Sequence, residues 1–322
     1  MLRGCLHLLL AIALSWAAIG HAQGDFPNRP LKLVVPFPPG GSVDVAARLV
    51  AKDLSDRLGQ PVVIENRAGA GGSVGSEFVA RSAPDGYHLV WGTVSSHATN
   101  MALLPNLKYD AIKDFAPITQ LTEQPLLFVV PVGSPISSFE QLLKASRAAP
   151  GGLTFGTPGV GTTGHLTGEL LKRSIGLNAR HVSYKGSHPM LTDLVGGQID
   201  FGIDNLPSAL AQVKAGRLKA LAITSKERSR LAPEIPPLAD SANGMVVVAW
   251  QGLFAPAGTP EPVLERLSRE VREILHRPEM RTKLIEMGTT PVGSPRAEFA
   301  DYVRAENARW AEVIREAGIR PD

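Results

Sequence analysis

The segment that most constrains the fold of this chain joins an apolar strand to a helix through a loop of prolines and glycines. Residues 31–35 have the length and β-branched content of a buried strand, and the prolines of 36–41 end it because proline cannot donate a ladder hydrogen bond. The glycines then expose backbone N–H groups before a helix predicted over 42–58, with Ser42 as its N-cap. Such N–H groups at a helix start attract anions. The candidate ligand residues here are Phe37, Gly40, Gly41, Ser42 and Asp44.

Short apolar strands alternate with helices as far as residue 203, and this order predicts a parallel α/β sheet. The first set comprises strands 31–36, 61–65 and 88–93 with helices 42–58 and 73–81. The second set, from about residue 125, comprises strands 126–131, 153–156, 179–183 and 199–203 with helices 139–148, 165–174 and 189–195. Both sets contain a strand, a loop and a helix start in the same order.

This repeat of topology, which is not a repeat of identical residues, predicts two α/β domains facing each other across a cleft. Ligands of open α/β sheets bind at the carboxyl ends of the strands, which would point into that cleft. The apolar run 245–256 is expected to cross back into the first domain and to form a hinge with a crossover near 120–126. Helices predicted over 260–276, 278–287 and 295–317 are expected to pack on the first domain. The predicted domain limits are 23–122 with 250–322, and 123–249.

The first 22 residues have the pattern of an export signal. Arg3 precedes an apolar stretch over 8–18 that is too short to span a bilayer, and small residues predict cleavage after Ala22. The only cysteine, Cys5, lies within this signal, so we expect the mature chain to lack disulfides, thiol catalysis and cysteine-based zinc sites. The expected location is a bacterial periplasm.

Composition narrows the possible partners. The chain carries a formal net charge of +3 without a basic block, with 44% hydrophobic and 20% charged residues. This is the composition of a globular protein, and it argues against nucleic-acid binding and against attachment to a membrane surface. The eight histidines are scattered and no complete cofactor motif is present, so neither a metal nor a cofactor is expected.

A second glycine-rich loop, residues 156–165, follows the strand predicted over 153–156. Its Gly-x-Gly-x-x-Gly pattern also occurs in dinucleotide sites. Such a site needs an acidic residue at the end of the next strand, where this chain has residues 181–184, His-Val-Ser-Tyr. The threonines of the loop are better suited to a carboxylate. The candidate ligand residues here are Thr157, Gly159, Gly161, Thr162 and Thr163.

Polar residues also follow two other predicted strands. Asp204 comes after strand 199–203, where it either binds an amino group or orients water in the cleft, or caps the next helix. Asp44 likewise has two open roles, because it either favours its helix dipole from the first turn or pairs with a ligand ammonium. The residues after strand 88–93 are predicted to line the cleft, with a solvated helix-capping loop as the alternative. They are Ser95, Ser96 and His97.

Signals for catalysis are weak. The chain has neither the Gly-x-Ser-x-Gly elbow of hydrolases nor the His-Glu-x-x-His pattern of zinc proteases. A triad of Ser95, His165 and Asp204 stays open, because such residues can meet in space from distant positions. We expect a binding protein and not an enzyme, with an exported α/β enzyme acting on a small carboxylic acid as the alternative.

Six blocks of the chain share a pattern with a known family. They are Arg29–Gly41 with Asp44 and Arg48, Gly59–Gly72, Pro84–Tyr87, Asp114–Ile118, Tyr184–Gly186 and Asp193–Asp200. These blocks closely resemble the Bug family, the TctC-type periplasmic solute receptors of tripartite tricarboxylate transporters. The resemblance covers essentially the whole mature chain. One departure is Ser183, where the family usually has proline, and it affects only the flank of a loop.

The resemblance implies a two-domain α/β periplasmic-binding-protein fold of the Venus-flytrap, type II-like kind, with a hinge of two crossovers. It also implies that loop backbone and ordered water hold a ligand carboxylate, with few charged side chains. The implied function is capture of a small carboxylate (an organic acid, an acidic amino acid or an aromatic acid) and delivery to the membrane subunits of the transporter. A monomer is expected, and a receptor that signals to a partner is a second alternative.

Overall fold

The computed structural model describes residues 26–320, and the predicted export signal lies outside them. In the first lobe, β1 (Leu31–Val35) lies between and parallel to β2 (Val62–Asn66) and β3 (His88–Thr93). β1 is central because four of its five side chains are buried, as a strand covered on both faces requires. The helices of this lobe are α2 (Ser42–Leu58), η2 (Ala70–Gly72), α3 (Ser73–Ala80), η3 (Ser95–Thr99) and α4 (Asn100–Leu103).

The second lobe repeats this arrangement. β5 (Leu153–Thr157) lies between and parallel to β6 (Ala179–Ser183) and β7 (Phe201–Asn205). The strand orders β2-β1-β3 and β6-β5-β7 are equivalent, so the predicted repeat of topology is confirmed. The other elements of this lobe are α5 (Phe139–Ala148), α6 (Thr163–Ile175), α7 (Ser187–Val195), α8 (Leu206–Lys214), β8 (Leu218–Ile223) and η4 (Leu238–Asp240).

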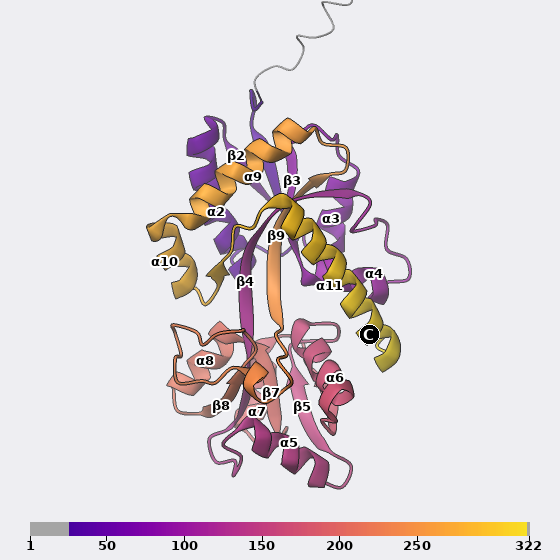
Figure 1. The fold of residues 1–322 in the computed structure, drawn as a ribbon, viewed down its shortest axis with the longest axis vertical. Helices are drawn as coiled ribbons and strands as arrows, with labels where there is room; N and C mark the ends of the chain where they lie inside the picture. The colour runs from indigo at the N-terminus through magenta and orange to yellow at the C-terminus, as the bar shows by residue number, and fades with distance from the viewer. Residues whose placement is uncertain (1–25, 321–322) are drawn as a thin grey trace, which may run out of the picture.

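Two long strands, β4 (Phe115–Pro131) and β9 (Val248–Pro256), join the lobes (Figure 1). They pair antiparallel from Phe115 opposite Pro256 to Pro125 opposite Val248, and β4 then continues into the second lobe, where it pairs with β7. The two predicted crossovers are therefore neighbouring strands of one sheet. The expectation of a parallel sheet holds within each lobe but is wrong at the hinge, because both crossover strands run antiparallel to their neighbours.

Some predicted elements have different limits. The strand predicted over 126–131 begins at Phe115, because the preceding residues pair along β9. β7 runs to Asn205, two residues beyond its predicted end, because Asn205 pairs with Leu126 of β4. β8 was not predicted. The residue-level domain limits stay a prediction.

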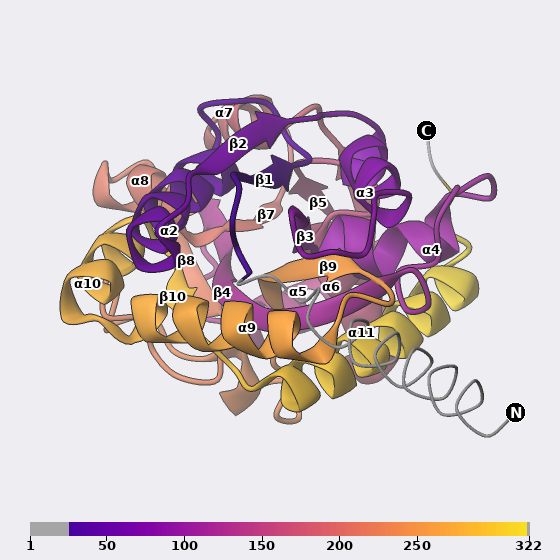
Figure 2. The ribbon, with the colours of Figure 1, turned by 90° about the horizontal axis from the view of Figure 1, so that it is seen from above.

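The C-terminal helices are α9 (Glu261–His276), α10 (Pro278–Glu286) and α11 (Arg296–Ala317), with the short strand β10 (Thr290–Pro291) between the last two. Seen from above, α9 and α11 lie along the same side of β4 and β9 (Figure 2). α11 packs on η3 and α4, and it also reaches α6, where Arg173 forms ion pairs with Glu312 and Glu316. It thus contacts both lobes, beyond the predicted packing on the first domain alone.

One buried apolar cluster runs through the hinge. It includes Val34 of the first lobe, Trp250 and Phe128 of the crossover strands, and Phe155 of the second lobe. Continuous packing of this kind keeps the two crossover strands together while each lobe has a further cluster of its own. No helix between residues 26 and 320 is long and apolar enough to span a membrane.

Candidate functional site

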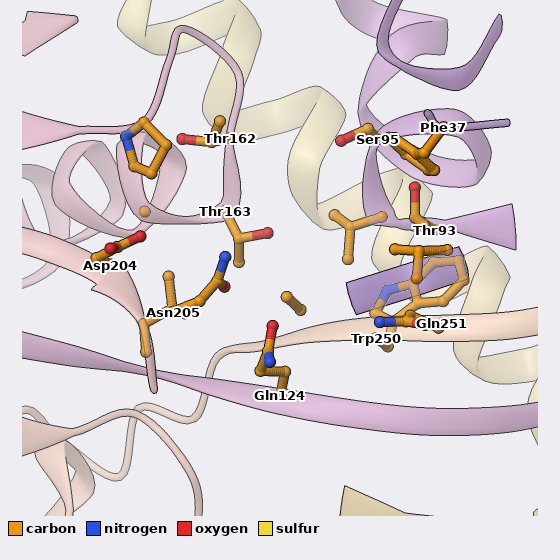
Figure 3. Close-up of a pocket in the computed structure, with 16 residues that line it drawn as sticks. Phe37, Thr93, Ser95, Gln124, Thr162, Thr163, Asp204, Asn205, Trp250 and Gln251 are labelled. Carbon is orange, nitrogen blue, oxygen red and sulfur yellow. The ribbon is translucent and has the colours of Figure 1, made fainter. Parts of the chain in front are cut away.

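A pocket lies between the two lobes, beside the hinge strands (Figure 3). The first lobe contributes Phe37, Val43, Thr93, Val94 and Ser95, the hinge strands Gln124, Leu126, Ala249, Trp250 and Gln251, and the second lobe Pro158, Thr162, Thr163, Gly164, Asp204 and Asn205. None of these lining residues is a lysine or an arginine. An anion in this pocket must therefore be held by backbone dipoles and neutral hydrogen-bond donors.

The start of α6 brings such donors to the pocket. Thr162 is the N-cap: its Oγ1 accepts from the N–H of His165 (3.4 Å) and donates to the carbonyl of Gly159 (2.8 Å). Thr163 makes no side-chain hydrogen bond within the described part of the chain, and Figure 3 shows its hydroxyl pointing into the pocket. The N-terminus of this 13-residue helix also carries partial positive charge. Thr163 and the first N–H groups of α6 thus form the anion-attracting end of the pocket.

Gly161 shapes the loop before α6. Its φ of +71° favours glycine. A Cβ added there would lie 2.4 Å from Cδ1 of Leu103 in α4, so this loop of the second lobe packs closely against the first lobe. Its N–H donates to Nδ1 of His165 (3.1 Å). Burial lowers the pKa of His165 to about 3, which keeps the ring neutral and able to accept this bond.

Three candidate residues of this loop do not line the pocket in this structure. Thr157 is fully buried, with its Oγ1 2.7 Å from Nε2 of His181. Gly159 and Gly161 form the turn behind Thr162. These three residues shape the loop, and Thr162 and Thr163 present it to the pocket.

Asp204 lines the pocket although its side chain is almost completely shielded from solvent. Its Oδ1 accepts from the hydroxyl of Ser187 (2.8 Å), and its Oδ2 accepts from that of Ser208 (2.6 Å). Burial raises the pKa of Asp204, and the two serine hydroxyls act against that rise. The residue at the N-cap position of α8 is Asn205, whose side chain makes no capping hydrogen bond, so Asp204 is not the cap considered for it.

Two glutamines bring side-chain amides from the hinge strands. Oε1 of Gln251 accepts from Nε1 of Trp91 (2.6 Å), which leaves its NH₂ group for the pocket. The amide of Gln124 makes no hydrogen bond with residues 26–320, and Figure 3 shows it pointing into the pocket from β4. A buried amide without a protein partner is costly, so the geometry favours a polar ligand or water beside it.

Aromatic side chains form the other end of the pocket. Figure 3 shows Phe37 and Trp250 there, away from Thr163 and Asp204. The indole of Trp250 is fixed from behind, because its Nε1 donates to Oε2 of Glu306 (3.1 Å). The pocket therefore has one end at Thr163 and Asp204 without aromatic rings, and one end where two rings lie beside the polar side chains of Thr93, Ser95 and Gln251.

The first predicted anion loop lies at the edge of this pocket. Phe37 is its only candidate residue in the lining, and Gly40 and Gly41 are exposed. The N-cap of α2 is Gly41, whose carbonyl accepts from the N–H of Val45 (3.0 Å). Ser42 is therefore the first helical residue and not the predicted cap.

Of the two roles considered for Asp44, the structure shows the structural one and not contact with a ligand. Its carboxylate accepts from the N–H of Gly40 (2.9 Å), from Nε of Arg48 (2.9 Å) and from Nδ2 of Asn66 (2.8 Å). The hydrogen bond from Arg48 is the largest of the effects that lower the pKa of Asp44 to about 2, with burial acting against it. Asp44 fastens the loop to α2 and β2 and does not line the pocket.

Of the three candidates after β3, only Ser95 lines the pocket. Ser96 and His97 are fully buried beneath it, with Nδ1 of His97 2.9 Å from Oγ of Ser96. The His97 ring stacks on Phe254 with centroids 4.0 Å apart, and burial lowers the pKa of His97 to about 3. Both residues anchor the turn that presents Ser95.

The three residues of the alternative catalytic triad do not form a hydrogen-bonded set. Ser95, His165 and Asp204 make no hydrogen bonds to one another, since Nδ1 of His165 accepts from Gly161 and both Asp204 oxygens accept from serines. Across residues 26–320, no group of three or more His, Cys, Asp or Glu side chains could hold a metal ion.

Sequence reasoning missed the hinge residues of the pocket. Gln124 and Gln251 could have been predicted to line a pocket, because each is a polar residue within an apolar crossover strand. Trp250 had no such signal, since a buried tryptophan is common in any α/β fold. Asn205 had the same signal as Asp204, because both are polar residues that follow the strand predicted over 199–203.

Known proteins share this sequence and fold. The family described as "Tripartite tricarboxylate transporter family receptor" matches residues 46–319. Protein BugT of Bordetella pertussis is 36% identical over 311 residues, which cover 96% of this chain and 95% of the relative. The structure of R. palustris Rpa4515 with adipate is similar at a TM-score of 0.79 and 37% identity, over 92% of this chain and all of that one. MatC from Rhodopseudomonas palustris with bound malate has a TM-score of 0.73 and 35% identity, over 90% and 100%.

These similarities extend through both lobes. The structure of the periplasmic binding protein BugD likewise covers 92% of this chain at a TM-score of 0.74 and 30% identity. The predicted two-domain periplasmic-binding-protein fold is thus confirmed. Because the family match spans most of the chain and the relatives align over nearly all of it, this chain belongs to the family of tripartite tricarboxylate transporter receptors.

Proposed function

We propose that this protein is a periplasmic receptor that captures a small carboxylate between its lobes and delivers it to a tripartite tricarboxylate transporter. The observation that carries the proposal is the open start of α6, where the Thr163 hydroxyl faces a pocket without lysine or arginine. Two related structures support a small carboxylate as the ligand, because one contains adipate and the other contains malate. Membership of the family supports the transporter as the partner.

In this proposal the ligand carboxylate binds at the start of α6. A helix N-terminus stabilises an anion by about 0.3–1 kcal/mol when exposed and by up to about 2 kcal/mol when partly buried. The hydroxyl of Thr163 and the amide of Gln124 add donors around it, and the amide of Gln251 lies at the other end of the pocket, beside Trp250. Asp204 would accept from a ligand amino group or from an ordered water.

The remainder of the ligand would lie toward Phe37, Ser95 and Trp250. The backbone N–H groups of the β1–α2 loop are proposed to approach it when the lobes close. They belong to Gly40, Gly41 and Ser42. Because the rings of Phe37 and Trp250 border this end of the pocket, it favours an apolar chain or ring beside them, with Thr93, Ser95 and Gln251 as polar neighbours.

Capture is proposed to close the lobes about β4 and β9. The pocket takes side chains from both lobes, so a ligand gains contacts in the closed state that it lacks in the open one. Small-angle scattering with and without ligand should show compaction. Saturable binding with unchanged dimensions would instead favour a rigid pocket, and with it the exported enzyme as the alternative function.

The first test is a thermal-shift panel of adipate, malate and benzoate, with the matching primary amides as controls. A ligand that binds only the folded state raises the melting temperature by mass action. We expect a shift with at least one acid and little with its amide. Shifts with neutral sugars but with none of the acids would contradict the proposed ligand class.

Mass spectrometry of small molecules released from the denatured protein would identify the natural ligand. An absence of turnover of that ligand would separate a receptor from an enzyme.

Export, cleavage after Ala22 and a monomeric state belong to the same proposal. N-terminal sequencing of periplasmic material should begin at or near Gln23, and light scattering should give the mass of one chain. Uncleaved protein recovered mainly from the cytoplasm would contradict the location.

A further inference from the structure

A second groove lies on the other face of the hinge strand β4, and we call it the back groove. Gln124 and Leu126 of β4 line the ligand pocket, whereas Glu123 and Pro125 line the back groove. This follows from strand geometry, because neighbouring side chains of a strand point to opposite faces. Figures 1 and 2 show α8 and α10 on the same side of β4, and the groove lies between these parts of the two lobes.

The lining of the back groove is positively charged. Four cations line it against the carboxylates of Glu123 and Glu227, an excess of two positive charges in a chain whose formal net charge is +3. The four cations are Lys226, Arg228, Arg230 and Arg281. The like charges of such a groove favour a negatively charged occupant.

None of these four cations forms an ion pair within residues 26–320. Arg228 donates to the carbonyl of Pro233 (2.8 Å), but the side chains of Lys226, Arg230 and Arg281 form no ion pair or hydrogen bond within residues 26–320. Arg281 is half-buried, and no carboxylate pairs with its guanidinium in the part of the chain that the structure describes. Elsewhere in the chain, arginines in comparable positions pair with glutamates, for example Arg57 with Glu270 (2.6 Å).

Both lobes build the back groove. The loop after β8 supplies three of the cations, and α10 of the first lobe supplies Arg281. The lobes also pack closely at this groove. Gly288 of the first lobe lies so near Pro207 of α8 in the second lobe that a Cβ added to Gly288 would be 2.5 Å from Cγ of Pro207. An occupant would therefore contact both lobes at once, while the ligand pocket on the other face of β4 stays free.

We propose that the back groove binds an acidic peptide segment of a protein partner. The cations are spread over two walls, with the carboxylates of Glu123 and Glu227 among them, an arrangement that suits several carboxylates spaced along a chain better than one compact anion. The groove and the ligand pocket share no lining residue, so a partner can hold the receptor while it carries cargo. As an interaction between largely exposed charges, it weakens as salt is added.

The test uses acetylated hexaglutamate amide as the probe and measures its affinity for the full chain by isothermal titration calorimetry at low ionic strength. The groove variant Lys226→Gln with Arg281→Gln should bind roughly tenfold more weakly, since each exposed ion pair contributes modestly. The matched control is Lys144→Gln with Arg180→Gln, one exposed lysine and one exposed arginine that lie outside the back groove and have no ion pair in the described chain. The control should bind the probe within about twofold of the wild type.

A second control separates the two anion sites, because the probe itself carries carboxylates. Thr163→Val alters the ligand pocket and should leave the affinity for hexaglutamate unchanged. Equal losses in the groove variant and in the Lys144/Arg180 control would mean attraction by overall charge only and would overturn the proposal. A loss in Thr163→Val as large as that in the groove variant would mean that glutamate side chains enter the ligand pocket, and would overturn it too. No measurable binding to the wild type at low salt would also refute it.

Discussion

Nε1 of Trp91 donates a 2.6 Å hydrogen bond to Oε1 of Gln251, and this bond links β3 of the first lobe to the hinge strand β9. It orients the glutamine, since the oxygen is turned to the indole and the NH₂ group is left to donate into the pocket. Both side chains are buried, so the alternative orientation would leave the indole N–H without an acceptor. The hinge thus presents a fixed donor to a ligand.

This bond leads to a prediction for Gln251→Glu. The carboxylate can still accept from Trp91, but it places a negative charge in the pocket, and repulsion should weaken binding of a carboxylate ligand by roughly 10- to 100-fold at pH 8. Calorimetry with the tightest acid from the thermal-shift panel measures the change. Gln251→Met is the uncharged control and should lose less affinity. Wild-type affinity in Gln251→Glu would show that the amide does not face the ligand.

Thr162 and Thr163 are neighbours with different expected roles. The Thr163 hydroxyl is free for the ligand, so Thr163→Val should weaken carboxylate binding by roughly fivefold and leave the melting temperature unchanged. The Thr162 hydroxyl caps α6, so Thr162→Val should lower the free energy of unfolding by about 1 kcal/mol. Urea unfolding and calorimetry on the same two variants measure both effects. If Thr163→Val costs stability and not affinity, its hydroxyl has been assigned wrongly.

The order of elements could be predicted because their local signals agree with the fold. The helices α2 and α5 have their predicted limits, since Gly41 and Gly59 bound α2, Ser138 caps α5, and an apolar stripe runs through each helix. The strand limits at the hinge could not be predicted. β4 extends back to Phe115 only because β9, more than a hundred residues later in the chain, supplies its pairing partners.

The pocket could be predicted only in part, for a related reason. Loops at the carboxyl ends of strands are visible in the sequence, and they gave Phe37, Ser95, Thr162, Thr163 and Asp204, which line it. Which face a loop residue turns to is decided by tertiary contacts. Asp44 turns to Arg48 and Asn66, and His97 turns to Phe254, so neither lines the pocket.

Glu306 is predicted to hold the aromatic end of the pocket in place. Its Oε2 accepts from Nε1 of Trp250 (3.1 Å) and from Nε1 of Trp310 (2.8 Å), and it is buried. Glu306→Leu leaves two buried indole N–H groups without acceptors and should lower the free energy of unfolding by about 2–4 kcal/mol. Glu306→Gln keeps an acceptor oxygen and should cost less than half as much. Urea unfolding followed by tryptophan fluorescence measures both, and equal losses would contradict a role as acceptor.

The buried ring of His97 predicts a pH dependence of stability. Burial lowers the pKa of His97 to about 3, whereas an unfolded histidine titrates near 6.5. Between these values the unfolded chain binds a proton that the folded chain does not, so the free energy of unfolding falls as pH falls through this window. At pH 5 the contribution of this one residue is a loss of about 2 kcal/mol relative to pH 7.5.

His97→Phe isolates that contribution. It keeps an aromatic ring against Phe254 but cannot titrate, so its free energy of unfolding should fall less than that of the wild type between pH 7.5 and pH 5, by about 2 kcal/mol. Any packing cost of the larger ring, or the loss of the bond to Ser96, is present at both pH values and cancels in the difference. His188→Gln, a change at an exposed histidine of α7, is the control for the loss of a histidine as such. Urea unfolding at the two pH values measures all three proteins. A wild-type pH dependence in His97→Phe would mean that His97 is not the buried neutral ring that fastens the turn carrying Ser95.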